Sequence, residues 1–88
     1  MTIKQLDNVQ KKDSFLYYRN EYSADAFFEF GNNSGIEKAR VEFSIEKTAI
    51  GETRINVNIS TQINYPILPA IKELKKYVEE KQAEGMFA

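Results

Sequence analysis

A row of polar side chains in the second half of the chain has the residue types best suited to chemistry. These side chains are amides, hydroxyls and cations that alternate with apolar residues: Lys38, Arg40, Arg54, Asn56, Asn58, Ser60, Gln62 and Asn64. Amides next to cations can hydrogen-bond the phosphates and sugars of a nucleic acid. Glu42 and Glu46 lie among the cations and offset their charge, so a plain solvated face explains the pattern as well. The sequence therefore offers a candidate nucleic-acid face made of Lys38, Arg40, Arg54, Asn56 and Asn58.

The composition argues against catalysis. The 88 residues include no histidine and no cysteine. Histidine is the usual general base and the commonest metal ligand, and cysteine supplies thiolate nucleophiles and zinc ligands. The carboxylates lack metal-binding spacing, and the glycine- and asparagine-rich stretch 31–35 lacks the lysine and the helix of a phosphate-binding loop. We expect a non-enzymatic protein with no catalytic residue, no cofactor and no metal.

Charge and hydropathy limit the partners and the location. The net charge of −1 and the pI near 5.5 give no overall attraction to nucleic acid or to an anionic membrane. The N-terminal residues lack the apolar core of a signal peptide, and no segment approaches the ~20 apolar residues that span a bilayer. The absence of cysteine fits a reducing compartment. These features predict a cytoplasmic protein that does not contact membranes.

Two segments in the middle of the chain predict a β-hairpin. Residues 36–49 and 52–65 alternate apolar and polar side chains with a period of two, so each has one face to bury. Gly51 suits the last position of a three-residue turn, where the backbone needs a positive φ. This turn sets the register that pairs Ile45 with Ile55, Phe43 with Val57, Val41 with Ile59, and Glu46 with Arg54.

Two aromatic-rich segments upstream predict a second hairpin. Residues 14–19 and 24–31 have high β propensity, and residues 20–23 between them are turn formers. We expect residues 1–12 to be an N-terminal arm, either loose or a short helical turn. Residues 13–88 then form a single domain.

The C-terminal segment predicts an amphipathic helix. Its apolar residues recur at spacings of three and four. Pro66 and Pro69 must lie in or before the first turn, and Gly85 is a suitable end. The expected fold is α+β: a four-stranded antiparallel sheet of two consecutive hairpins, packed on one C-terminal helix. This order of elements is similar to that of the Pur-alpha repeat and the Whirly proteins, which bind single-stranded nucleic acid.

The expected core takes the apolar faces of these elements, and it leaves some aromatic residues over. Its members are Phe15, Tyr17, Phe28, Phe30, Val41, Phe43, Ile45, Ile55, Val57, Ile59, Ile67, Ile71, Leu74 and Val78. One helix covers one face of the sheet, so Phe27 on the other face indicates a partner, often a second copy. We expect a binding or adaptor protein with its contact at Tyr18, Tyr22 and Phe27. The partner is a second copy, joined through the sheet or its edge, or an unidentified protein; single-stranded nucleic acid is the alternative.

Overall fold

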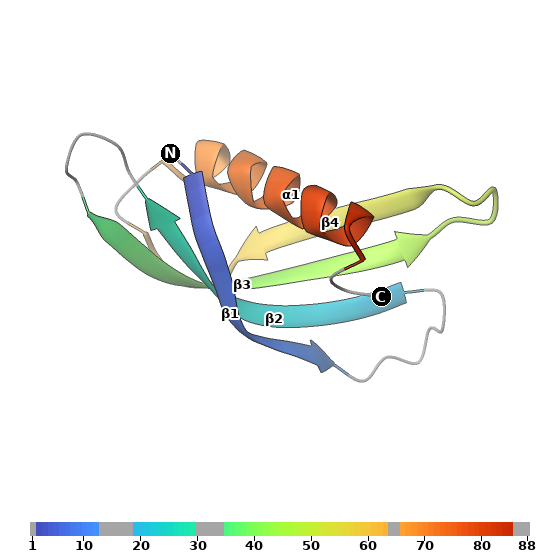
Figure 1. The fold of residues 1–88 in the computed structure, drawn as a ribbon, viewed down its shortest axis with the longest axis horizontal. Helices are drawn as coiled ribbons and strands as arrows, with labels where there is room; N and C mark the ends of the chain where they lie inside the picture. Colours follow the sequence, from blue (N-terminus) through green and yellow to red (C-terminus); the bar gives the residue numbers. More distant parts are fainter. Residues whose placement is uncertain (1, 13–18, 30–34, 64–65, 86–88) are drawn as a thin grey trace.

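The computed structural model describes residues 2–12, 19–29, 35–63 and 66–85. Its elements are β1 (Thr2–Lys12), β2 (Arg19–Glu29), β3 (Ile36–Lys47), β4 (Thr53–Ile59) and α1 (Ile67–Ala83). The strands form one antiparallel sheet in the order β1-β2-β3-β4, and α1 lies on one side of it (Figure 1). The α+β fold expected from the sequence is confirmed.

The hairpin of β3 and β4 has the predicted register, with Val41 opposite Ile59, Phe43 opposite Val57, Ile45 opposite Ile55 and Glu46 opposite Arg54. Gly51 adopts a φ of 87°, as the turn requires. The Thr48 N–H donates to the Glu52 carbonyl at 2.8 Å and so closes the hairpin. Alternation and turn chemistry were sufficient here because they agree with each other.

The first strand is β1, in the segment that we expected to be a loose arm or a short helical turn. The reason for the error is a β-bulge. Ile3 lies opposite Phe28 and Leu6 lies opposite Ala26, so three residues of β1 span two residues of β2. A spacing of three between buried residues imitates a helix when it is read from the sequence.

The expected turn at 20–23 is also wrong, because these residues lie inside β2. Of the expected strand 14–19, Arg19 begins β2 and the rest lies outside the described residues. The aromatic segment therefore contributes one long strand, and β1 is its partner. Tyr22 consequently shares a face with Ala24 and Phe28 and points into the core.

Most of the expected core residues that the structure describes are buried: Phe28, Val41, Phe43, Ile45, Ile55, Ile59, Leu74 and Val78. Val57 and Ile71 are partly buried against this cluster. The expectation is wrong for Ile67, which is 48% exposed because it begins α1 one turn ahead of its first buried residue, Ala70. Phe15, Tyr17 and Phe30 lie outside the described residues.

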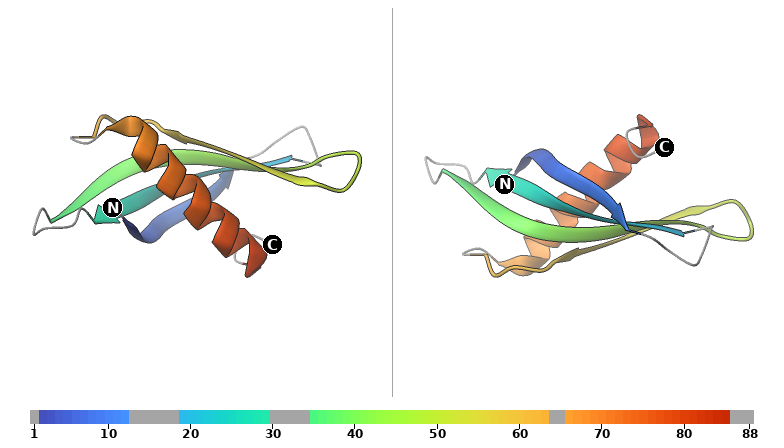
Figure 2. Two further views of the ribbon diagram at one scale, coloured as in Figure 1. Left: turned by 90° about the horizontal axis from the view of Figure 1, so that it is seen from above. Right: turned by 90° about the horizontal axis from the view of Figure 1, so that it is seen from below.

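Small side chains complete the core beneath the helix. Ala26 of β2 lies opposite Ala39 of β3, and both belong to the same cluster as Ala70 of α1. α1 crosses the strands at a steep angle (Figure 2). Alanine lets the backbones of the packed layers approach closely, and the bulk comes from Phe43, which stacks on Tyr22 with ring centroids 5.1 Å apart.

The ends of α1 match the sequence rules. Pro66 is the N-cap residue, and Pro69 lies in the first turn, where a missing N–H breaks no helical bond. Gly85 has a φ of 85° and donates its N–H to the Gln82 carbonyl, which ends the helix.

Replacing Leu6 tests whether β1 is part of the folded core. Leu6 is 7% exposed, so Leu6→Ala should lower the free energy of unfolding by about 2–5 kcal/mol. The control Val9→Ala, at a position 36% exposed on the same strand, should cost less than about 1 kcal/mol. Urea denaturation measures both; equal, small effects would mean that β1 is a dispensable arm.

Candidate interaction surfaces

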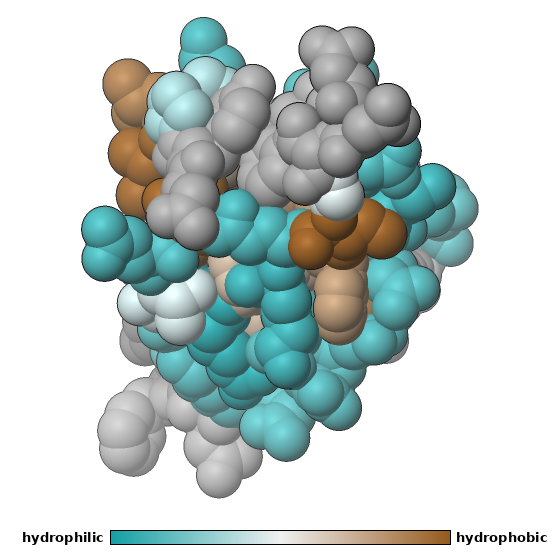
Figure 3. Space-filling view, turned by 90° about the vertical axis from the view of Figure 1, so that its left-hand side faces the viewer, coloured by the Kyte–Doolittle hydropathy of each residue, from teal (hydrophilic) through white to brown (hydrophobic). Residues whose placement is uncertain are grey.

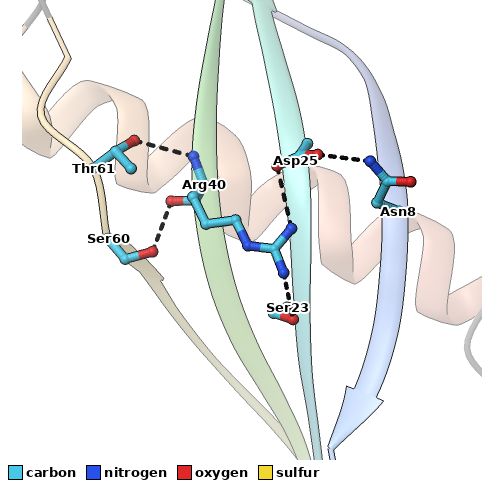
Figure 4. A network of polar contacts seen from close by, with 6 residues as sticks. All are labelled: Asn8, Ser23, Asp25, Arg40, Ser60 and Thr61. Atoms are coloured by element: carbon cyan, nitrogen blue, oxygen red, sulfur yellow. Dashed lines mark hydrogen bonds and ion pairs between the residues drawn. The ribbon is translucent and has the colours of Figure 1, made fainter.

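The sheet has a polar face, which we define as the side with Asp25 and Phe27 of β2, Arg40 of β3, and Asn56 and Asn58 of β4. α1 lies behind the sheet when this side is viewed (Figure 4). The described residues place no second layer on it. Its polar groups must therefore find partners among themselves or in water.

A hydrogen-bonded network crosses three strands at the middle of the polar face. Arg40 donates from Nη1 to Asp25 Oδ1 at 3.2 Å and from Nη2 to Ser23 Oγ at 3.0 Å. Asn8 Nδ2 donates to Asp25 Oδ2 at 2.8 Å (Figure 4). Asn8 has a φ of 52°, a left-handed conformation that asparagine tolerates, and it lies at the second bulge of β1. We call Asn8, Ser23, Asp25 and Arg40 the Asp25 network.

The Asp25 network keeps its carboxylate charged. Asp25 is only 8% exposed, and burial alone would raise its pKa. The hydrogen bonds from Asn8 and Arg40, with further help from the charge of Lys38, hold the pKa of Asp25 below its ordinary value. The guanidinium of Arg40 is therefore engaged within the protein.

Other cations on the polar face are paired as well. Lys12 Nζ lies 2.7 Å from Glu42 Oε2. Arg19 lies 3.5 Å from Glu21 and 3.9 Å from Glu46. Each of these carboxylates belongs to the same sheet, so the face has little net positive charge with which to attract a phosphate backbone.

The candidate nucleic-acid residues are thus on one face but not in one site. Lys38 is exposed beside Phe27, and Arg54 is exposed opposite Glu46. Asn56 lies opposite Ser44 and Asn58 opposite Glu42, both with exposed side chains. Alternation correctly predicted the shared face. It could not predict that Arg40 pairs with Asp25, a residue that sequence analysis did not single out.

The candidate protein-contact residues are separated. Tyr22 is 6% exposed and belongs to the core, so it is removed from the contact surface. Phe27 is half-buried on the polar face, between Gln5 of β1 and Lys38 of β3. Tyr18 lies outside the described residues. In the described chain, Phe27 is thus the one remaining member of this group.

The two edges of the sheet differ. β1 carries two register shifts, a left-handed residue and Lys4, Lys11 and Lys12, all of which hinder the addition of another strand. β4 pairs with β3 without a register shift and contains neither proline nor lysine. No strand in the described part of the chain covers the outer side of β4. β4 is therefore an open edge.

Two hydrogen bonds identify the backbone groups at this open edge. The Ser60 N–H donates to the Arg40 carbonyl at 2.8 Å, and the Thr48 N–H donates to the Glu52 carbonyl. Bonded and non-bonded positions alternate along an antiparallel pair. The residues whose N–H and C=O groups turn away from β3 are therefore Thr53, Ile55, Val57 and Ile59.

A groove lies beside the open edge. Residues 53–56 of β4 form one side, and Lys75, Glu79 and Gln82 of α1 form the other. These helix residues are spaced four and three apart, so they share one flank of α1. We call this feature the edge groove; it offers opposite charges next to outward-facing backbone groups.

Exposed apolar side chains elsewhere do not form one continuous patch. The large ones include Ile36 at the start of β3, and Ile67 and Leu68 at the start of α1. Both elements begin toward the end of the molecule seen in Figure 3, where the brown apolar areas are separated by polar residues. Scattered apolar residues of this kind are common on protein surfaces.

The described residues also bear on metal and membrane binding. In ranges 2–12, 19–29, 35–63 and 66–85, no three carboxylates gather in a way that could hold a metal ion. The helix formed by these residues lacks the length and hydrophobicity of a membrane span.

Comparison with known proteins supplies the family. The model of the BB_0187 family matches residues 1–83. The chain belongs to this family. The match runs from β1 through α1, so the strand that resembled an arm lies within the family's shared region. No curated protein and no solved structure matches the chain, and the geometry therefore carries the functional argument.

The Asp25 network should make stability depend on pH. Because the pKa of Asp25 is lowered by folding, its stabilisation is present at neutral pH and is lost as the pH falls through and below about 4. Asp25→Asn should be less stable than the wild type at pH 7, and the difference should shrink in acid. Urea denaturation from pH 7 to pH 3 measures this.

The control for that experiment is Glu29→Gln, which alters a surface ion pair with Lys4 on the neighbouring strand. Exposed ion pairs contribute little, so this variant should follow the wild type closely. A difference between Asp25→Asn and wild type that stays constant with pH would contradict the role given to the Asp25 carboxylate.

Proposed function

We propose that this protein is a small non-enzymatic binding protein that acts through protein contacts and self-associates at the open edge of β4. The observation that carries the proposal is the unhindered row of outward N–H and C=O groups on Thr53, Ile55, Val57 and Ile59. An added strand would give each of them a partner. The absence of cysteine favours the cytoplasm as the place where this happens.

The contrast between the two edges supports this choice of surface. An open edge is normally a risk, and proteins limit it with bulges, lysines or proline. This chain has such features on β1 and lacks them on β4. Retaining one open edge beside a groove is the arrangement expected of a surface that receives another strand.

Phe27 is a weaker candidate for the contact. It is half-buried and stands alone among polar neighbours, Gln5 and Lys38. A stable interface needs a central cluster of apolar side chains, not a single ring. Nucleic acid is also disfavoured, because Arg40, Lys12 and Arg19 are each paired with a carboxylate.

A proline in β4 tests the role of the edge. Val57→Pro removes an outward N–H but no hydrogen bond to β3, so the fold should persist. We expect self-association to weaken roughly tenfold or more, because each association loses backbone hydrogen bonds. Val57→Ala keeps the N–H and serves as the matched control. Light scattering over a range of concentrations gives the mass relative to the 10.2 kDa chain.

A second variant separates the edge from the polar face. Phe27→Asp should leave the mass unchanged, because Phe27 lies two strands away from β4. If Phe27→Asp dissociates the protein while its circular dichroism stays normal, the contact is on the polar face. A wild-type protein that is monomeric at every concentration would refute self-association itself.

Binding of oligonucleotides is expected to be absent. Single-stranded DNA or RNA labelled with a fluorophore should show no change in anisotropy even at low salt, roughly 50 mM, where phosphate contacts are strongest. Affinity that falls steeply as salt rises, and that is lost in Arg54→Ala, would instead support the nucleic-acid face.

A further inference from the structure

We infer that the occupant of the open edge is a second copy of this chain, whose β4 pairs antiparallel with the first about a two-fold axis at Asn56. This inference rests on the proposed function and specifies its partner and geometry. The two sheets then form one continuous sheet, with α1 of both copies on the same side.

The register follows from which groups point outward. Hydrogen bonds between two β4 strands can form only between residues whose backbone groups face the open edge. Asn56 is the central residue of β4, so an axis there overlaps the strands completely and gives every outward residue a partner. The expected pairs are Thr53 with Ile59, Ile55 with Val57, Arg54 with Asn58, and Asn56 with Asn56 of the second copy.

The side chains suit this register. On the helix side, Ile55 would adjoin Val57 of the second copy and extend the apolar surface across the axis. On the polar face, Arg54 would adjoin Asn58, and the two Asn56 amides would face each other as both donors and acceptors. No pair places like charges directly opposite.

The edge groove adds charge complementarity. A two-fold axis perpendicular to the sheet makes the two α1 helices antiparallel near the axis. The flank of each helix beside β4 carries Lys75 and Glu79. Reversal of one flank against the other sets lysine toward glutamate in both directions, which favours the correct orientation and disfavours a parallel arrangement.

The remaining edges explain why assembly would stop at two copies. Pairing through β4 uses both open edges, so the continuous sheet ends at β1 on either side. Both outer edges carry the bulges and lysines that hinder strand addition. The association is therefore isologous and closed, and it does not grow into a fibre.

Disulfide trapping tests the axis, and the chain contains no cysteine of its own. Asn56 would face its own copy at a non-hydrogen-bonded position, where Cα atoms lie about 4.5 Å apart, within the range for a disulfide. Asn56→Cys should give a covalent dimer on a non-reducing gel after mild oxidation. Arg54→Cys and Asn58→Cys should each remain monomeric on the gel.

A mixture supplies the positive control for the two monomeric variants. Arg54→Cys equilibrated with Asn58→Cys should form the crosslink that neither forms alone. A wild-type dimer in light scattering without an Asn56→Cys crosslink would overturn the register and leave the proposed function standing. Equal crosslinking at all three positions would indicate random collision and also overturn it. A monomer without any crosslink would refute both proposals.

Discussion

One helix can cover one face of a four-stranded sheet, and the rest of this structure depends on that constraint. α1 crosses the sheet, contacts both edge strands and buries the apolar side of every strand. The opposite side has no such cover in the described chain. There the buried carboxylate of Asp25 is held by Asn8 and Arg40, so that hydrogen bonds replace packing as the source of order.

The same constraint gives the charged residues a structural role. A cation on an uncovered sheet can face a ligand or pair with a neighbouring carboxylate. Here the pairs connect strands: Lys12 of β1 reaches Glu42 of β3, and Arg40 reaches Asp25 of β2. Such contacts limit sliding between strands more than they add to the free energy of folding. The polar face is accordingly a stabilised surface with little net charge, and the edges are where the sheet can gain a neighbour.

The sequence predicted the β3–β4 hairpin to the residue because alternation, turn chemistry and the Glu46–Arg54 pair agree. It misplaced β1 because the bulge between Ile3 and Leu6 breaks the period of two that identifies a strand. Once β1 was assigned as an arm, the aromatic segment had to supply two strands, and Tyr22 was placed in a turn. One local irregularity thus displaced two elements.

For the candidate surfaces, sequence pattern could give the shared face of Arg40, Asn56 and Asn58 but not their partners. The pairing of Arg40 with Asp25 depends on the β2–β3 register, and the open edge of β4 depends on the order of strands. Both are properties of the assembled sheet. A charged residue within an aromatic strand, as Asp25 is, was the available signal that a polar partner lay across from it.

The order of strands has a kinetic consequence. Each strand pairs with its neighbour along the chain, so no β-pairing requires the closure of a long loop. The β3–β4 hairpin has the shortest connection and can form first, after which β2 and β1 add in turn. α1 joins the last residues of the fold to the first through its contact with β1. The slowest step should therefore be the docking of this helix, which alone links the two ends of the chain.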